Sequence, residues 1–114
     1  MLRLLIADDE EIIRNALSRM IDYPALGYEL IASARNGMEA YDIICDESPD
    51  VVITDIKMPI LDGIGLIERT KKSDPETEFI LLSGYAEFEY AKKAMKNGVK
   101  QYLLKPTDKQ ELID

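Results

Sequence analysis

Carboxylates follow two apolar runs directly, and this arrangement narrowly constrains how the chain can fold. The run LLIA at residues 4–7 is followed by DDEE at residues 8–11, and VVIT at residues 51–54 is followed by Asp55. If both runs are adjacent parallel strands, three carboxylates converge at one end of a sheet. Like charges about 5 Å apart repel by roughly 3 kcal/mol per pair at an effective dielectric near 20, so the fold needs a cation there. The sequence therefore predicts a divalent metal site.

The length and net charge of the chain limit the class of protein to which it can belong. Its 114 residues fit one domain, so we expect a single domain over residues 1–114. Fourteen basic and 22 acidic residues give a net charge of −8, which opposes nucleic-acid binding by this domain alone. Residues 1–7 are too short an apolar stretch for a signal peptide or a membrane span.

Cys45 is the only cysteine of the chain. One cysteine excludes an internal disulfide framework and a cysteine-rich zinc site, so the expected compartment is the reducing cytoplasm. No basic residue is near it in sequence, so we expect Cys45 to be an unreactive, buried or half-buried thiol on the second helix.

Apolar runs alternate with amphipathic stretches, a rhythm that predicts an α/β fold with a parallel sheet and helices on both faces. The expected strands are residues 2–7, 29–34, 50–54, 78–82 and 101–104. The expected helices are residues 10–21, a segment from the Asn36 N-cap to about 47, residues 64–72, residues 87–96, and a start at 108–114.

Two of these helices carry further local signals. Asn36 and Glu39 have the spacing of an N-cap and its capping-box acid. In the first helix, apolar residues at helical spacing are expected to face the sheet: Ile12, Ile13, Ala16, Leu17 and Met20.

Polar residues stand where the apolar strands stop, and ligands of open α/β sheets bind outside the carboxyl ends of strands. Taken singly, each has a structural explanation: a capping box for the first acids, a turn after the fourth strand, a solvated lysine after the fifth. Capping alone does not readily explain why five polar residues all stand at strand ends. In particular, no helix immediately follows the third strand, so the acid there has no helix to cap. The five are Asp8, Asp9, Asp55, Ser83 and Lys105.

This constellation resembles the receiver domain of two-component response regulators, over essentially the whole chain. The acids Asp8 and Asp9 are similar to the metal-binding pair of that family, and Asp55 in the segment DIKMP to its phosphoacceptor. Ser83 is similar to its switch hydroxyl and Tyr102 to its aromatic switch residue. Lys105, followed by Pro106, is similar to its characteristic lysine.

The resemblance implies a flavodoxin-like, doubly wound, five-stranded parallel sheet in the order 2-1-3-4-5. It also implies Mg²⁺ held by Asp9, Asp55 and the backbone carbonyl of Lys57, with Asp8 holding a metal-bound water. Residues 83–91 and 102–106 further resemble receivers attached to AraC-type helix-turn-helix regulators. The chain departs from the family in length, because the fifth helix stops at Asp114, which indicates a truncated helix or a further domain.

The side chains are consistent with this chemistry. A carboxylate is ionised at pH 7, so Asp55 can attack a phosphoryl group without a general base and form an acyl phosphate. Mg²⁺ and Lys105 would stabilise the charge of the transferring group, and Ser83 would add a hydrogen bond. The chain has no histidine, so the donor must be a separate histidine kinase or a small phosphodonor.

The expected function is a phosphoacceptor switch, not an enzyme, that controls an attached effector, expected to be a DNA-binding transcription regulator. A magnesium phosphohydrolase is an alternative, but Lys57 stands two residues after Asp55, where such enzymes need a general acid. A phosphorylation-independent interaction domain is another, although none of Asp9, Asp55 and Lys105 is lost. We expect no membrane partner. We do expect a phosphorylation-dependent homodimer, formed through the fourth helix, the fifth strand and the fifth helix.

Overall fold

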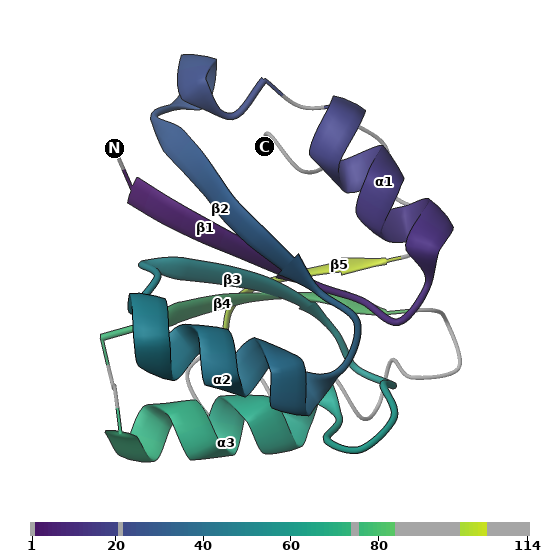
Figure 1. Cartoon of the computed structure of the whole chain (residues 1–114), viewed down its shortest axis with the longest axis vertical. Coiled ribbons are helices and arrows are strands. Elements are labelled where there is room, and N and C mark those ends of the chain that lie inside the picture. Colours follow the sequence, from purple (N-terminus) through teal and green to yellow (C-terminus); the bar gives the residue numbers. More distant parts are fainter. Residues whose placement is uncertain (1, 21, 74–75, 84–98, 105–114) are drawn as a thin grey trace.

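The chain forms one parallel sheet in the computed structural model, which describes residues 2–20, 22–73, 76–83 and 99–104 (Figure 1). The sheet order is β2-β1-β3-β4-β5, with every neighbouring pair parallel. This order confirms the expected flavodoxin-like topology. The strands are β1 (Leu2–Ala7), β2 (Tyr28–Ala34), β3 (Val51–Asp55), β4 (Glu78–Ser83) and β5 (Val99–Leu104).

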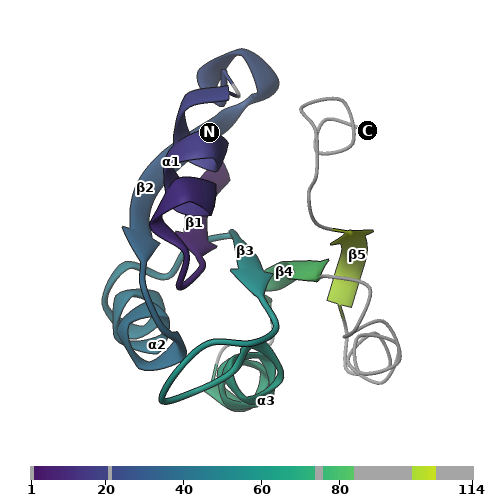
Figure 2. The ribbon, with the colours of Figure 1, turned by 90° about the vertical axis from the view of Figure 1, so that its right-hand side faces the viewer.

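Helices lie on both faces of the sheet, as the βα rhythm predicts. Helix α1 (Glu11–Met20) covers one face, and α2 (Gly37–Glu47) and α3 (Gly63–Ser73) cover the other (Figure 2). A short 3₁₀ helix, η1 (Pro24–Leu26), precedes β2. The expected helices at residues 87–96 and 108–114 lie outside the described residues. Among the described residues, no helix is long and apolar enough to cross a membrane.

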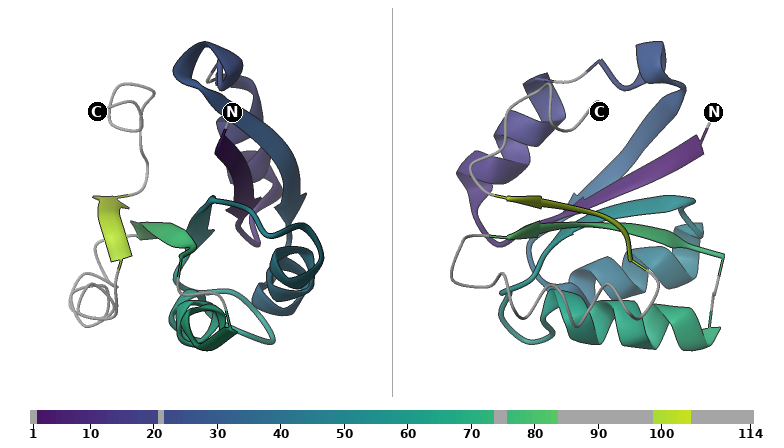
Figure 3. Two further views of the ribbon diagram at one scale, coloured as in Figure 1. Left: turned by 90° about the vertical axis from the view of Figure 1, so that its left-hand side faces the viewer. Right: turned by 180° about the vertical axis from the view of Figure 1, so that it is seen from behind.

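Two clusters of buried side chains alternate along the strands. Leu5 and Ala7 of β1 pack with residues of α2 and α3, whereas Leu4 and Ile6 pack with Leu17 of α1. Every residue of β3 is buried because helices cover the middle of a doubly wound sheet on both faces. The view from behind in Figure 3 shows α1 on the opposite face from α2 and α3.

The expected stripe of α1 is partly wrong. Ile12 is 80% exposed, whereas Leu17 is buried and Ile13 and Ala16 are half-buried. The buried stripe is centred on Ile13 and Leu17, which are four residues apart on one side of the helix. Ile12 is rotated about 100° from Ile13, so it lies beyond the edge of the stripe. The Met20 side chain is outside the described part of the chain.

The structure confirms the N-cap of α2 and the place of Cys45 on that helix, but the expected burial of Cys45 is wrong. Asn36 Oδ1 accepts a hydrogen bond from the Glu39 amide at 2.8 Å, while the Glu39 carboxylate accepts one from the Arg35 amide at 3.3 Å. Helix α2 therefore has its N-cap, but the acid bonds one residue earlier than in a capping box. Cys45 is exposed, because the buried face of α2 runs through Ala40 and Ile44 and the next residue turns outward.

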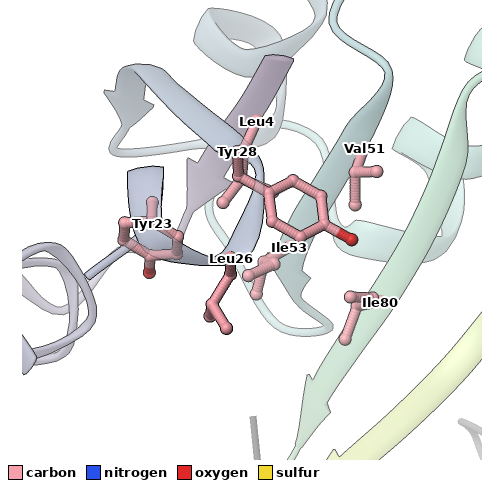
Figure 4. Close-up of a pocket in the computed structure, with 7 residues that line it drawn as sticks. All are labelled: Leu4, Tyr23, Leu26, Tyr28, Val51, Ile53 and Ile80. Atoms are coloured by element: carbon pink, nitrogen blue, oxygen red, sulfur yellow. The ribbon is translucent and has the colours of Figure 1, made fainter. Parts of the chain in front are cut away.

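Tyr23 joins the end of α1 to the start of β2. Its hydroxyl donates a 2.6 Å hydrogen bond to the carbonyl of Leu17, one of the last four in α1, which have no intrahelical donor. Burial raises the pKa of Tyr23 to about 12. The ring also lines an apolar pocket on the α1 side of the sheet (Figure 4), formed by Leu4, Tyr23, Leu26, Tyr28, Val51, Ile53 and Ile80.

Tyr23→Phe should destabilise the domain at pH 8 and change its response to alkali. Loss of the bond to Leu17 should cost about 1 kcal/mol of unfolding free energy at pH 8. Because the folded pKa is about 12 against 10 in the unfolded chain, the wild type loses stability between these pH values, by about 1.4 kcal/mol per unit. The phenylalanine variant lacks this loss, so the two proteins should be about equally stable near pH 11. Urea unfolding of both proteins from pH 8 to pH 11 measures the difference between their unfolding free energies. A difference that stays constant with pH would contradict the prediction.

Candidate metal and phosphoacceptor site

Four carboxylates meet at the carboxyl edge of the sheet. One carboxylate oxygen from each of Asp8, Asp9, Glu10 and Asp55 lies within 4.8 Å of the others. Asp8 and Asp55 are buried, at 0% and 6% exposure, while Asp9 and Glu10 are exposed. The cluster forms because β1 and β3 are direct neighbours that run in the same direction. The convergence of Asp8, Asp9 and Asp55 agrees with the strand pattern; Glu10 joins them because α1 begins only at Glu11.

The turn that carries the first three acids is held at Asp8. Its amide donates to the Ala34 carbonyl at 3.1 Å and so continues the pairing of β1 with β2. Its Oδ1 accepts from the Glu10 amide at 2.9 Å, the pattern of an Asx turn. Arg14 Nη1 donates to the Asp8 carbonyl at 2.8 Å. Asp8 thus has a structural role in its turn in addition to its place in the acidic cluster.

Asp55 ends β3, one residue later than the expected strand end. Its Oδ1 accepts a hydrogen bond from the Ile56 amide at 2.8 Å, which fixes the orientation of the carboxylate. Gly63 brings the start of α3 back against this strand end: its amide donates to the Ile56 carbonyl at 2.7 Å. A Cβ at Gly63 would lie 2.1 Å from the Asp55 carbonyl oxygen, so only glycine fits without displacing backbone.

The loop between Asp55 and α3 contains a tight γ-turn. The Leu61 amide donates to the Pro59 carbonyl at 2.8 Å across Ile60, whose φ is 74°. This kind of turn is rare and strained, and a positive φ is especially unfavourable for a β-branched residue. The turn sets Leu61 against α2, where a Cβ at Gly37 would lie 1.9 Å from the Leu61 carbonyl oxygen.

Ile60→Gly should stabilise the domain, because glycine adopts a positive φ without steric cost. Relief of the backbone strain at such a residue should stabilise the folded state by on the order of 1–3 kcal/mol. Glycine has greater conformational freedom in the unfolded chain, which reduces this gain by roughly 0.5–1 kcal/mol. Ile60→Ala is the matched control, since it removes the same exposed side chain and keeps the Cβ. We expect the glycine variant to exceed the alanine variant by about 1 kcal/mol in urea unfolding. Equal stability would show that the γ-turn is not strained.

The remaining predicted site residues are only partly described. Lys57 is exposed in the loop two residues after Asp55. Ser83 ends β4 and pairs in register with Leu104, the last residue of β5, so the strand preceding Lys105 ends beside it. Tyr102 lies in β5 opposite Leu81. The side chains of Ser83 and Tyr102, and all of Lys105, lie outside what the structure describes.

The donor set fits a hard divalent cation. Carboxylate oxygens are the ligands that Mg²⁺ prefers, and it binds through one or two carboxylates while keeping several waters. Two buried and two exposed acids around one point also repel one another, and a bound cation would offset this repulsion. The residues present therefore suit Mg²⁺ better than Zn²⁺, which usually takes histidine or cysteine ligands.

Comparison with known proteins identifies relatives over almost the whole chain. Residues 4–114 match the family described as the response regulator receiver domain. The chain is 50% identical over 113 residues to YesN, an uncharacterized transcriptional regulatory protein of Bacillus subtilis (strain 168). That alignment covers 99% of this chain and 31% of YesN. The chain spans less than half the length of the first curated relatives that it matches, 31–44%.

Solved structures also resemble this chain over almost its whole length. The REC domain of AraT, a response regulator from Geobacillus stearothermophilus, has a TM-score of 0.93 and 40% identity, covering 97% of this chain and 86% of that one. A two-component transcriptional regulator AraC from Clostridium phytofermentans has a TM-score of 0.91 and 38% identity, covering 100% and 88% of the two chains.

Proposed function

Because this chain belongs to the response regulator receiver domain family of two-component systems, we propose that it accepts a phosphoryl group on Asp55 with the help of Mg²⁺. The observation that carries the proposal is the buried Asp55 carboxylate within a cluster of three further acids at one edge of the sheet. The cluster supplies both a nucleophile and ligands for the cation that phosphoryl transfer needs.

Asp55 acts as the nucleophile in this proposal. An ionised carboxylate oxygen forms a bond to phosphorus while the bond between phosphorus and the donor breaks, and the leaving group keeps the electron pair. The hydrogen bond from the Ile56 amide holds the carboxylate in one orientation, so little rotation must be frozen out during transfer. The product is an acyl phosphate on Asp55.

Mg²⁺ would be held by the carboxylates of Asp9 and Asp55 and the backbone carbonyl of Lys57, with Asp8 holding a metal-bound water. When bound, the ion neutralises charge on the transferring phosphoryl oxygens. Glu10 lies in the same cluster and would add negative potential at its exposed side.

Lys105 and Ser83 would contact the phosphoryl group from the ends of β5 and β4. We assign Lys105 to charge stabilisation, and Ser83 with Tyr102 to the conformational response. The pairing of Ser83 with Leu104 supports this assignment, because it places the ends of the two strands side by side.

The partners follow from the family and from the composition. The chain has no histidine, so a separate histidine kinase would supply the phosphoryl group. Two of its relatives are described as transcriptional regulators, which supports an attached DNA-binding effector of the AraC type beyond this single receiver domain. The single cysteine is consistent with action in the cytoplasm. A phosphorylation-dependent homodimer would use β5 and the expected helices at residues 87–96 and 108–114, and these two helices lie outside the described residues.

The test is phosphorylation of the wild-type domain by acetyl phosphate, followed by intact mass and by peptide mapping. We expect one added phosphoryl group, on the peptide that contains Asp55, sensitive to hydroxylamine as acyl phosphates are. Chelation of divalent metal should prevent its addition. Labelling that persists under chelation, or a phosphoryl group on another residue, would overturn the proposal.

A further inference from the structure

We propose that Arg14 is a positioning residue of the metal site, which orients Asp9 through the backbone of Asp8. The proposal rests on the proposed function of the acidic cluster as a cation site. Its starting observation is the 2.8 Å hydrogen bond from Arg14 Nη1 to the Asp8 carbonyl oxygen. Arg14 itself contributes no ligand atom, so its effect on the cation passes through the turn.

Arg14 is well placed for this contact by its position on α1. Its amide donates to the Glu10 carbonyl at 3.0 Å, so it belongs to the first turn of the helix. Side chains of a helix tilt toward its N-terminus, and the half-buried Arg14 therefore reaches back to the turn before Glu11. A positively charged side chain near a helix N-terminus interacts unfavourably with the helix dipole, but the guanidinium of Arg14 stands beside a run of acids.

The carbonyl that Arg14 holds belongs to the peptide unit between Asp8 and Asp9. A peptide unit is planar, so the direction of this carbonyl sets the direction in which the chain leaves Asp8 and thus the position of Asp9. The Asp8 amide is already tied to Ala34, and its side chain to the Glu10 amide. The bond from Arg14 adds a constraint on the Asp8 carbonyl itself, and its loss would leave the peptide unit between Asp8 and Asp9 less firmly held.

The charge of Arg14 and its geometric role affect cation binding in opposite directions. A guanidinium near a cation site weakens binding of the cation by charge repulsion, so removal of the charge alone should tighten Mg²⁺ binding. Removal of the positioning bond should weaken it. The sign of the change therefore separates the two effects, and a residue with only a general structural role would shift the melting temperature without a change in Mg²⁺ affinity.

The experiment measures the Mg²⁺ dissociation constant by calorimetric titration, at a temperature where circular dichroism shows every variant folded. Arg14→Met should bind Mg²⁺ roughly tenfold more weakly, the lower end of what loss of an outer-shell partner costs at metal sites. Arg14→Lys, which keeps a donor and the charge, should recover most of this loss. Arg19→Met is the matched control: it removes the same charge from an exposed position of α1 and should bind like the wild type.

An Arg14→Met protein with unchanged or tighter Mg²⁺ binding would overturn the role of Arg14. Arg14→Gln, whose amide is too short to reach the carbonyl, should show the same weakening and carries the test if Arg14→Met does not fold. A wild-type protein that binds no Mg²⁺ would overturn the metal site itself, which distinguishes that failure from the failure of Arg14 alone.

Discussion

Asp55→Asn should reduce phosphorylation by acetyl phosphate to an undetectable level. Asparagine has nearly the shape of aspartate, and its side-chain oxygen still accepts the hydrogen bond from the Ile56 amide, so the fold should persist. Its amide is uncharged and a poor nucleophile, so the step that forms the bond to phosphorus is lost. Intact mass after incubation with acetyl phosphate and Mg²⁺ measures the result.

The control for this variant is Asp42→Asn, which removes the same charge from an exposed position of α2. It should be labelled like the wild type. Thermal unfolding of Asp55→Asn without Mg²⁺ should show a folded domain, more stable than the wild type, because one of the clustered charges is gone. Labelling of Asp55→Asn at the wild-type level would exclude Asp55 as the phosphoacceptor.

The parallel sheet could be predicted because apolar runs alternate with amphipathic stretches along the chain. The family resemblance supplied the strand order, which makes β1 and β3 neighbours, and the structure brings Asp8, Asp9 and Asp55 together accordingly. Strand ends were accurate to one or two residues: β3 includes Asp55, and β5 begins at Val99. These differences do not move the site, because the neighbours and directions of the strands determine which edge the acids share.

Local details depend on tertiary contacts that no periodic pattern contains. Spacing alone placed Ile12 on the buried stripe of α1, but the helix covers the sheet only along the narrower line through Ile13 and Leu17. The positive φ of Ile60 could not be predicted, since isoleucine disfavours it. Contacts at both ends of the loop impose it, with Gly63 against Asp55 and Leu61 against α2. The contact from Arg14 to Asp8 was missed too, although an arginine soon after an acidic run is a visible signal.

Mg²⁺ should stabilise the domain strongly, because folding brings Asp55 to the three consecutive acids at residues 8–10 and the unfolded chain separates Asp55 from them. At a hundredfold excess over its dissociation constant, a ligand that binds only the folded state adds about 2.7 kcal/mol. For a domain of this length that corresponds to a rise of about 10 °C in melting temperature. Scans with MgCl₂, against KCl at equal ionic strength, separate site binding from general screening.

Asp9→Ala should abolish most of that rise. Asp9 is exposed, so its removal costs little packing, and it takes one carboxylate from the cluster. The metal-free variant should equal or exceed the metal-free wild type in stability, since like charges about 5 Å apart repel by roughly 3 kcal/mol per pair at an effective dielectric near 20. Glu11→Ala is the matched control, because it removes an exposed acid next to the cluster and should keep the Mg²⁺ shift. If Mg²⁺ raised the melting temperature of the wild type and of Asp9→Ala equally, the cation would bind elsewhere on this acidic chain. The repulsion among the clustered acids would then have to be offset by another positive charge.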